Sequence, residues 1–236
     1  MIRNYFVGTM AASVVTLFGT CALAQHEGDI EFGTDASGGA LIVAGWVFEG
    51  EFGDFGTSFF TDEPGFEAVE AVEGDLYPLA EGDEVGFNVL STLLYWDGTM
   101  KTIPVNEPEL EISAGFSTVV TPTSGPMPGF LFGTADMDGG IHQHLDFTLT
   151  PGADAGSGAA PLGAYGFWLQ LTSPQHDPSD PFLIVLNQGL DAQAFEAGVE
   201  ALHDMGVPEP GTLALLSAAM VGGLAIPRRR RHCSAG

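Results

Sequence analysis

Two histidines and an aspartate stand at alternate positions in residues 140–146, which read Gly-Ile-His-Gln-His-Leu-Asp. Successive side chains of a β-strand point to opposite faces, so we expect His142, His144 and Asp146 to share one face. Two imidazoles and a carboxylate placed in this way could bind zinc or a similar divalent ion. The alternative is a polar strand face that carries ordinary surface histidines. Because the chain has only six histidines, the presence of two of them in this short segment favours the metal site over ordinary surface histidines.

Further candidate cation ligands lie elsewhere in the chain. His26 and His176 would complete the site if the fold brings them close to it. Residues 136–140 place two carboxylates before a glycine turn, like the start of a calcium loop, but the later ligands and the bidentate glutamate are missing. An acidic turn before a strand is therefore favoured there over calcium binding. The acidic loops 62–67 and 81–84 either are solvated or collect divalent cations weakly.

The sequence contains no recognisable catalytic motif. It has neither the metalloprotease pattern H-E-x-x-H nor a phosphate-binding loop. Ser157 lies between two glycines, but alanine occupies both positions at which a nucleophile elbow needs glycine. Paired carboxylates for glycoside hydrolysis are uninformative in so acidic a chain. We therefore predict a protein that is not an enzyme.

The charge of the chain limits the classes of molecule that it can bind. The 31 acidic residues against 6 basic ones give a formal net charge of -25, which repels phosphate backbones and excludes nucleic acid as a partner. Residues 25–206 hold 30 of the acids and Lys101 as their only basic residue, a formal charge of -29, so divalent cations are their natural small partners. The only cysteines, Cys21 and Cys233, lie near opposite ends, which excludes a disulfide framework.

Short apolar segments separated by turn residues recur between residues 25 and 206. Many strands at short spacing, without alternating helices, predict an all-β domain built as an antiparallel β-sandwich or jelly roll. Three tryptophans, Trp46, Trp96 and Trp168, fall within these segments and are expected in the core. The expected strands are 29–34, 40–48, 85–90, 93–96, 110–120, 141–150, 164–172 and 182–186.

One amphipathic helix is expected near the C-terminal end of this domain. Asp191 can cap a helix that runs to about Asp204. Phe195, Val199 and Leu202 then fall on one face, which we expect to pack against the end of the sheet.

Residues 1–24 have the pattern of a secretory signal peptide. Arg3 precedes an apolar run over residues 5–18, and Ala22-Leu23-Ala24 supplies small residues at the cleavage positions before Gln25. The alternative is a lipoprotein acylated at Cys21, but residues 18–20 suit that signal poorly.

The C-terminal segment combines a proline-rich start, an apolar stretch and a basic end. The apolar residues 213–226 are short for a membrane span, which needs roughly 20 residues, and a core helix is the alternative. The basic block that follows favours the cytoplasmic side of a membrane, so we expect a transmembrane helix with a cytoplasmic tail at residues 232–236. The basic residues of this block are Arg228, Arg229, Arg230 and Arg231.

These residues carry a family resemblance. The string VPEPGTLALLSAAMVGGLAIPRRRR, residues 207–231, resembles the PEP-CTERM sorting signal of Gram-negative bacteria. The resemblance implies that Pro208, Glu209 and Pro210 are recognised by an exosortase, a membrane enzyme of which this chain would be a substrate. It further implies that the helix and its arginines hold the chain in the inner membrane before processing. Delivery to the cell surface or the extracellular matrix would follow.

The exported part also resembles a group of PEP-CTERM proteins. Its strings HEGDIEFG, FFTDEPGF, VGFNVL, GGIHQHLDFTL and DPFLIVLNQG are similar to those of a group associated with zinc-repressor control. This resemblance makes His142 and His144 the best-matched polar positions and implies a link to zinc, although the histidine-rich tract of a high-capacity scavenger is missing.

Two functions remain open from the sequence. The first is a surface-anchored module that binds a divalent metal, zinc in the first place, at His142 and His144 with Asp146 or another residue; calcium is the other metal considered for the chain. The second is a structural or adhesive component of the extracellular polysaccharide matrix, without a specific metal site.

Overall fold

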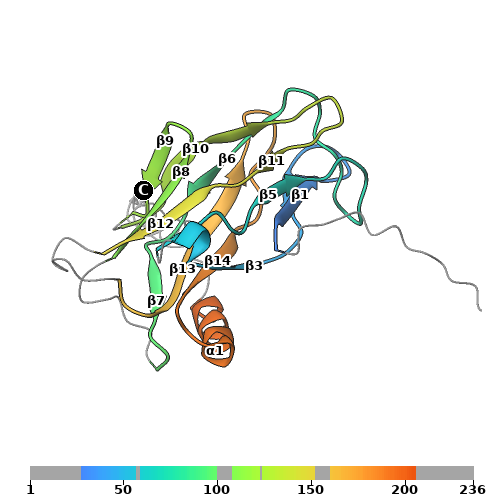
Figure 1. The fold of residues 1–236 in the computed structure, drawn as a ribbon. Coiled ribbons are helices and arrows are strands. Elements are labelled where there is room, and N and C mark those ends of the chain that lie inside the picture. Colours follow the sequence, from blue (N-terminus) through green and yellow to red (C-terminus); the bar gives the residue numbers. More distant parts are fainter. Residues whose placement is uncertain (1–27, 57–58, 100–107, 123, 152–159, 206–236) are drawn as a thin grey trace, which may run out of the picture.

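A computed structural model describes residues 28–56, 59–99, 108–122, 124–151 and 160–205 (Figure 1). The expected signal peptide, His26, the Pro-Glu-Pro motif and the C-terminal helix with its arginines all lie outside these residues. Within them, no helix has the length and apolar character needed to cross a membrane.

The described chain is predominantly β, as the sequence predicts, with one α-helix and one 3-10 helix, η1 (Asp54–Gly56). The strands are β1 (Ile30–Thr34), β2 (Leu41–Val43), β3 (Val47–Glu51), β4 (Phe60–Thr61), β5 (Phe66–Ala68), β6 (Glu84–Val89), β7 (Leu94–Trp96), β8 (Glu109–Ala114), β9 (Ser117–Val120), β10 (Met127–Thr134), β11 (His142–Gln143), β12 (Asp146–Thr150), β13 (Gly163–Thr172) and β14 (Phe182–Gln188).

The strands form three sheets. Their orders are β11-β5-β1-β2, then β10-β6-β13-β14-β3 with β7 also paired to β13, and β4-β12-β8-β9. Most neighbours are antiparallel, but β1 pairs parallel with β5, and β3 pairs parallel with β14. The prediction of purely antiparallel sheets is therefore wrong. Hairpin-connected segments favour antiparallel pairing, whereas both parallel pairs join strands that are not consecutive in the chain.

Three of the expected strands are divided in the structure. Residues 110–120 form the hairpin of β8 and β9, with Gly115 at a φ of 59° in its turn. Residues 40–48 break at Gly45, whose φ is 154°, and Trp46 between β2 and β3 is 61% exposed rather than buried. The third break separates β11 from β12 at His144 and Leu145. This last break shapes the functional site.

An apolar core joins the three sheets. Aromatic side chains from separate sheets meet within it, such as Phe66 of β5 and Phe132 of β10, whose ring centroids lie 5.0 Å apart. A second apolar cluster contains Trp96 and Trp168, which are buried as predicted. Such aromatic burial is a main source of the free energy that stabilises the fold.

Helix α1 (Ala192–His203) confirms the predicted helix. Asp191 is its N-cap, and a carboxylate oxygen of Asp191 accepts the N–H of Ala194 at 2.9 Å. The predicted apolar face packs against the second cluster, so the helix covers the sheet at β13 and β14 (Figure 1).

Two chain segments form a ribbon that passes from one sheet to another. β4 pairs antiparallel with β12 in the third sheet, and β5 pairs antiparallel with β11 in the first. Both segments change sheets together, at residues 62–65 on one side and at residues 144–145 on the other. β1 lies beside β5 in the first sheet, and Ile30 donates its N–H to the carbonyl of Gly65 at 2.8 Å. Three distant parts of the chain therefore meet at this bend.

Candidate metal centre

His142, His144 and Asp29 come together at the bend of the ribbon. Their ligand atoms all lie within 4.8 Å of one another. The Nε2 atoms of His142 and His144 are 3.1 Å apart, and the Nε2 of His142 is 3.5 Å from the Oδ2 of Asp29. Zinc bonds of about 2.0–2.2 Å in a tetrahedron place neighbouring donor atoms about 3.3 Å apart. Both measured separations are close to this value, and the third is bounded by 4.8 Å, so the arrangement is compatible with one shared zinc ion.

Asp29 lies at the base of this group. Its side chain is only 2% exposed. The Oδ1 atom accepts the N–H of Gly65 at 3.1 Å, but Oδ2 has no hydrogen-bond partner among the described residues. A buried carboxylate oxygen without a partner is costly in free energy and is rare in folded proteins. Oδ2 is thus a buried anionic atom that faces an imidazole nitrogen.

The backbone orients the ring of His144 for ligation. The Nδ1 atom lies 3.0 Å from the carbonyl oxygen of Asp62. A carbonyl only accepts hydrogen bonds, so this contact assigns a proton to Nδ1; in the neutral ring the lone pair then lies on Nε2, which is 3.1 Å from the Nε2 of His142. Metal-bound histidines usually have such a partner on their other ring nitrogen. The loop between β4 and β5 therefore holds His144 in a form that can bind a metal.

Gly65 allows Asp29 and His144 to approach each other. A Cβ atom on this residue would lie 2.7 Å from the Oδ1 of Asp29 and 2.8 Å from the Cε1 of His144. Both separations are shorter than van der Waals contact, so a side chain at this position would displace one or both ligands.

Substitution of Gly65 by alanine is therefore expected to weaken zinc binding by at least about 10-fold, because it disturbs a group that orients a ligand. It should also lower the free energy of unfolding by about 1–3 kcal/mol through overpacking. Isothermal titration with zinc and urea denaturation measure the two effects. Gly39→Ala, on an exposed turn, is the matched control and should change neither the zinc affinity nor the free energy of unfolding by much. Equal zinc affinities for the two variants would contradict the role assigned to Gly65.

Glu63 and Asp62 form a second group around the other nitrogen of His144. Ligand atoms of these three residues also lie within 4.8 Å of one another. The Oε1 of Glu63 is 3.8 Å from the Nδ1 of His144, and its Oε2 accepts the N–H of Gly65 at 3.2 Å. Burial raises the pKa of Glu63; the charge of His144 opposes this rise, and the charges of Asp29 and Asp62 add to it. Since the Nδ1 of His144 already donates to the carbonyl of Asp62, this acidic group borders the cluster of Asp29, His142 and His144 without joining it.

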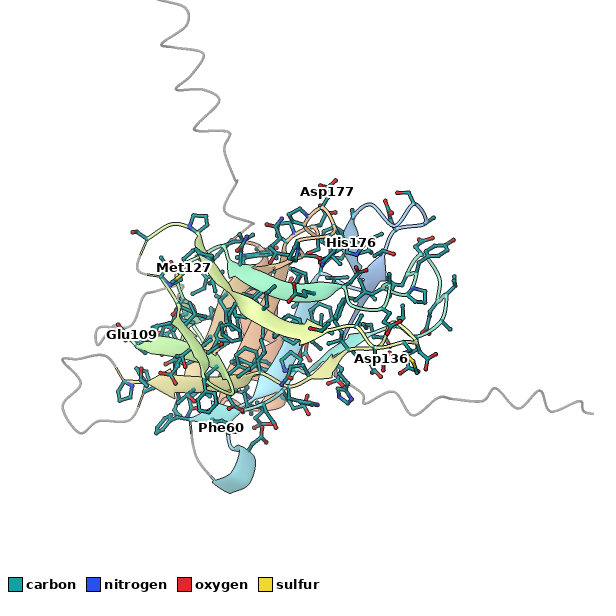
Figure 2. The ribbon with its side chains drawn as sticks, turned by 90° about the horizontal axis from the view of Figure 1, so that it is seen from above. Phe60, Glu109, Met127, Asp136, His176 and Asp177 are labelled. Carbon is teal, nitrogen blue, oxygen red and sulfur yellow. The ribbon has the colours of Figure 1, made fainter. Side chains whose placement is uncertain are left out.

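Asp146 and His176 do not join either group of ligand atoms among the described residues. Asp146 begins β12, after the break at residues 144–145, and pairs with Ser113 in the third sheet. His176 contacts the carbonyl of Gly38 through Nδ1 at 3.0 Å and a carboxylate oxygen of Asp83 through Nε2 at 2.8 Å. In Figure 2, His176 lies in the upper part of the view, and Phe60, the first residue of β4, lies at the lower edge.

The loop at residues 136–140 is an internally bonded acidic turn. The Oδ1 of Asp136 accepts the N–H groups of Asp138 and Gly140, each at 2.9 Å. This matches the acidic turn that the sequence favours at this place.

Sequence reasoning missed Asp29 as a candidate ligand and treated Asp62 and Glu63 only as members of an acidic loop. The available signal for Asp29 was a single carboxylate directly before an apolar strand. That signal is common and does not reveal which histidines the strand will approach.

Comparisons with known proteins do not assign the chain to a family, because no family model matches it and no curated protein matches it. Its chemistry is therefore argued from the site itself. The donor set is two imidazole nitrogens and one carboxylate oxygen, a set suited to zinc and neighbouring transition metals.

Proposed function

We propose that this protein is a non-enzymatic module that binds zinc through Asp29, His142 and His144. The observation that carries the proposal is the buried Oδ2 of Asp29, which has no hydrogen-bond partner among the described residues and faces the Nε2 of His142. A divalent cation would neutralise this carboxylate and engage both imidazoles. Calcium is disfavoured, since it prefers a shell made of oxygen ligands.

We further propose that the protein works outside the cytoplasm of a Gram-negative bacterium, as a β-sandwich-like domain on the cell surface or in the extracellular matrix. The support is in the sequence: a signal-peptide pattern at residues 1–24 and the string at residues 207–231 that resembles an exosortase sorting signal. In this proposal, the exosortase and the membrane are partners during sorting. The absence of cysteine between residues 25 and 206 is compatible with an oxidising compartment.

The test is a calorimetric titration of the purified, metal-stripped chain with zinc and, separately, with calcium. One saturable zinc site per chain is expected, and a chelator should remove the metal. Calcium should give no saturable heat at the concentrations that saturate with zinc. If zinc also gave no saturable binding, the metal proposal would fail, and the alternative, a structural or adhesive component of the polysaccharide matrix, would replace it.

A further inference from the structure

We propose that Thr61 is a positioning residue of the zinc site, which acts on His144 through the peptide unit between Asp62 and Glu63. Thr61 is the last residue of β4, and its side chain lies in the interior of the fold. The inference rests on the zinc site proposed above and adds to it a group that does not touch the metal.

The hydroxyl of Thr61 makes two hydrogen bonds whose directions are fixed by chemistry. The backbone N–H of Glu63 lies 3.1 Å from Oγ1, and since an N–H only donates, Oγ1 accepts this bond. The hydroxyl donates its own proton to the Oδ2 of Asp54, in η1, at 2.5 Å. A short bond to a carboxylate belongs to the stronger class of hydrogen bonds. Thr61 thus ties the first residues after β4 to η1.

The peptide unit between Asp62 and Glu63 carries the effect of Thr61 to the metal ligand. This peptide bond is trans and planar, so its C=O and its N–H point in opposite directions. The N–H donates to Thr61, and the C=O accepts the proton on the Nδ1 of His144 at 3.0 Å. A rotation of the plane would weaken both bonds together. The hydroxyl of Thr61 therefore holds the carbonyl toward the imidazole ring.

These bonds form one chain between a metal ligand and a carboxylate. The chain runs from the Nδ1 of His144 through the peptide unit and the hydroxyl of Thr61 to Asp54, and each member donates toward Asp54. Hydrogen bonds aligned in this way polarise one another. A carboxylate behind the second nitrogen of a histidine orients the ring and makes it a stronger ligand. Asp54 acts in the same sense here, but through two intervening groups.

The loop that contains this peptide unit also reaches the second metal ligand and rests on another sheet. At its far end, the N–H of Gly65 donates to the Oδ1 of Asp29. A Cβ atom on Gly50 of β3 would lie 2.5 Å from the carbonyl oxygen of Glu63, so the loop backbone lies directly against this glycine. A shift at the start of the loop would therefore disturb both His144 and Asp29.

The experiment compares Thr61→Val and Thr61→Ser with a matched control, Thr121→Val, in the full chain. Valine keeps the shape of threonine without its hydroxyl, whereas serine keeps the hydroxyl. Thr121 is also buried, and its Oγ1 also accepts a backbone N–H, that of Leu110 at 3.2 Å. Calorimetric titration should show zinc binding about 10-fold weaker in Thr61→Val, and near the unmodified value in the other two variants. Both valine variants should lower the urea midpoint, because each leaves a buried N–H unpaired.

A second measurement, on the metal-free protein, separates positioning from stability. NMR of the imidazole nitrogens reports which nitrogen of a neutral ring carries the proton, and the spectrum of His144→Ala assigns the signals of His144. The unmodified chain should carry this proton on Nδ1. Thr61→Val should move part of the population to the form protonated on Nε2, whereas Thr61→Ser and Thr121→Val should not.

The outcomes distinguish this inference from the proposed function. An unchanged zinc affinity and an unchanged His144 tautomer in Thr61→Val would overturn the inference and leave the zinc site intact. Failure of the unmodified chain to bind zinc would overturn both. If Thr61→Val does not fold, Asp54→Ala replaces it, since Asp54 is only partly buried and accepts the other bond of the hydroxyl. Weaker zinc binding with the same tautomer shift would then support the inference, and no change in either would overturn it.

Discussion

Replacing both site histidines by alanine is expected to abolish the stabilisation that zinc gives to this protein. A metal that binds only the folded state stabilises it by about 2.7 kcal/mol when its concentration is 100 times its dissociation constant. The variant His142→Ala/His144→Ala keeps only Asp29 of the three ligands, so this gain should vanish. Thermal unfolding with and without zinc measures it directly.

The same substitutions should cost little in the metal-free protein. The side chain of His142 is nearly half exposed, and neither histidine belongs to the apolar core. The matched control is His203→Ala, which removes a histidine from the exposed side of α1 and should keep the full response to zinc. A double variant that still gained stability from zinc as the unmodified chain does would exclude these histidines as ligands.

The sequence predicts the part of this site that depends on local geometry. The alternation of a β-strand places His142 and His144 on one side and directs Ile141, Leu145 and Phe147 to the core, and all three apolar side chains are buried. The same rule expects Asp146 to share the face of the histidines. Asp146 does not join the two histidines among the described residues, because the chain passes from the first sheet to the third between β11 and β12, and strand alternation does not say where a strand will break.

The rest of the site depends on contacts between distant parts of the chain. Asp29 reaches the histidines only because β1 pairs in parallel with β5, which in turn pairs with β11. Neither pairing leaves a local pattern. The tautomer of His144 likewise depends on the carbonyl of Asp62, a backbone atom that no side-chain motif reveals.

The fold shows the same division between local and distant information. The apolar run of β14 and the capped helix α1 are predicted because their signals are local. β10 was missed because it begins with Met127-Pro128-Gly129, residues that favour a turn over a strand. Its pairing with β6 has shifts in register, which accommodate these residues in the sheet.

Asp29→Asn is expected to have opposite effects in the absence and in the presence of zinc. Without zinc, the variant should be at least as stable as the unmodified chain, by up to about 1 kcal/mol, because a neutral amide replaces a buried carboxylate whose Oδ2 accepts no hydrogen bond among the described residues. The amide oxygen can still accept the N–H of Gly65. With zinc, the variant should fall behind the unmodified chain by about 2 kcal/mol or more, because an amide oxygen is a poor zinc ligand.

This reversal separates a metal ligand from a residue that only supports the fold. Asp83 is the matched control, since it is also buried, but its Oδ2 is fully used by the N–H of Ala80 and by His176. Asp83→Asn should therefore lower stability by a similar amount in both conditions and keep the gain from zinc. If Asp29→Asn behaved in the same way, Asp29 would be a structural residue. Urea denaturation of the three proteins, each with zinc and with a chelator, distinguishes the two cases. Removing a metal ligand should leave the free energy of unfolding unchanged or higher in the metal-free protein and should lower it in the metal-bound protein. Removing a structural residue should lower it in both.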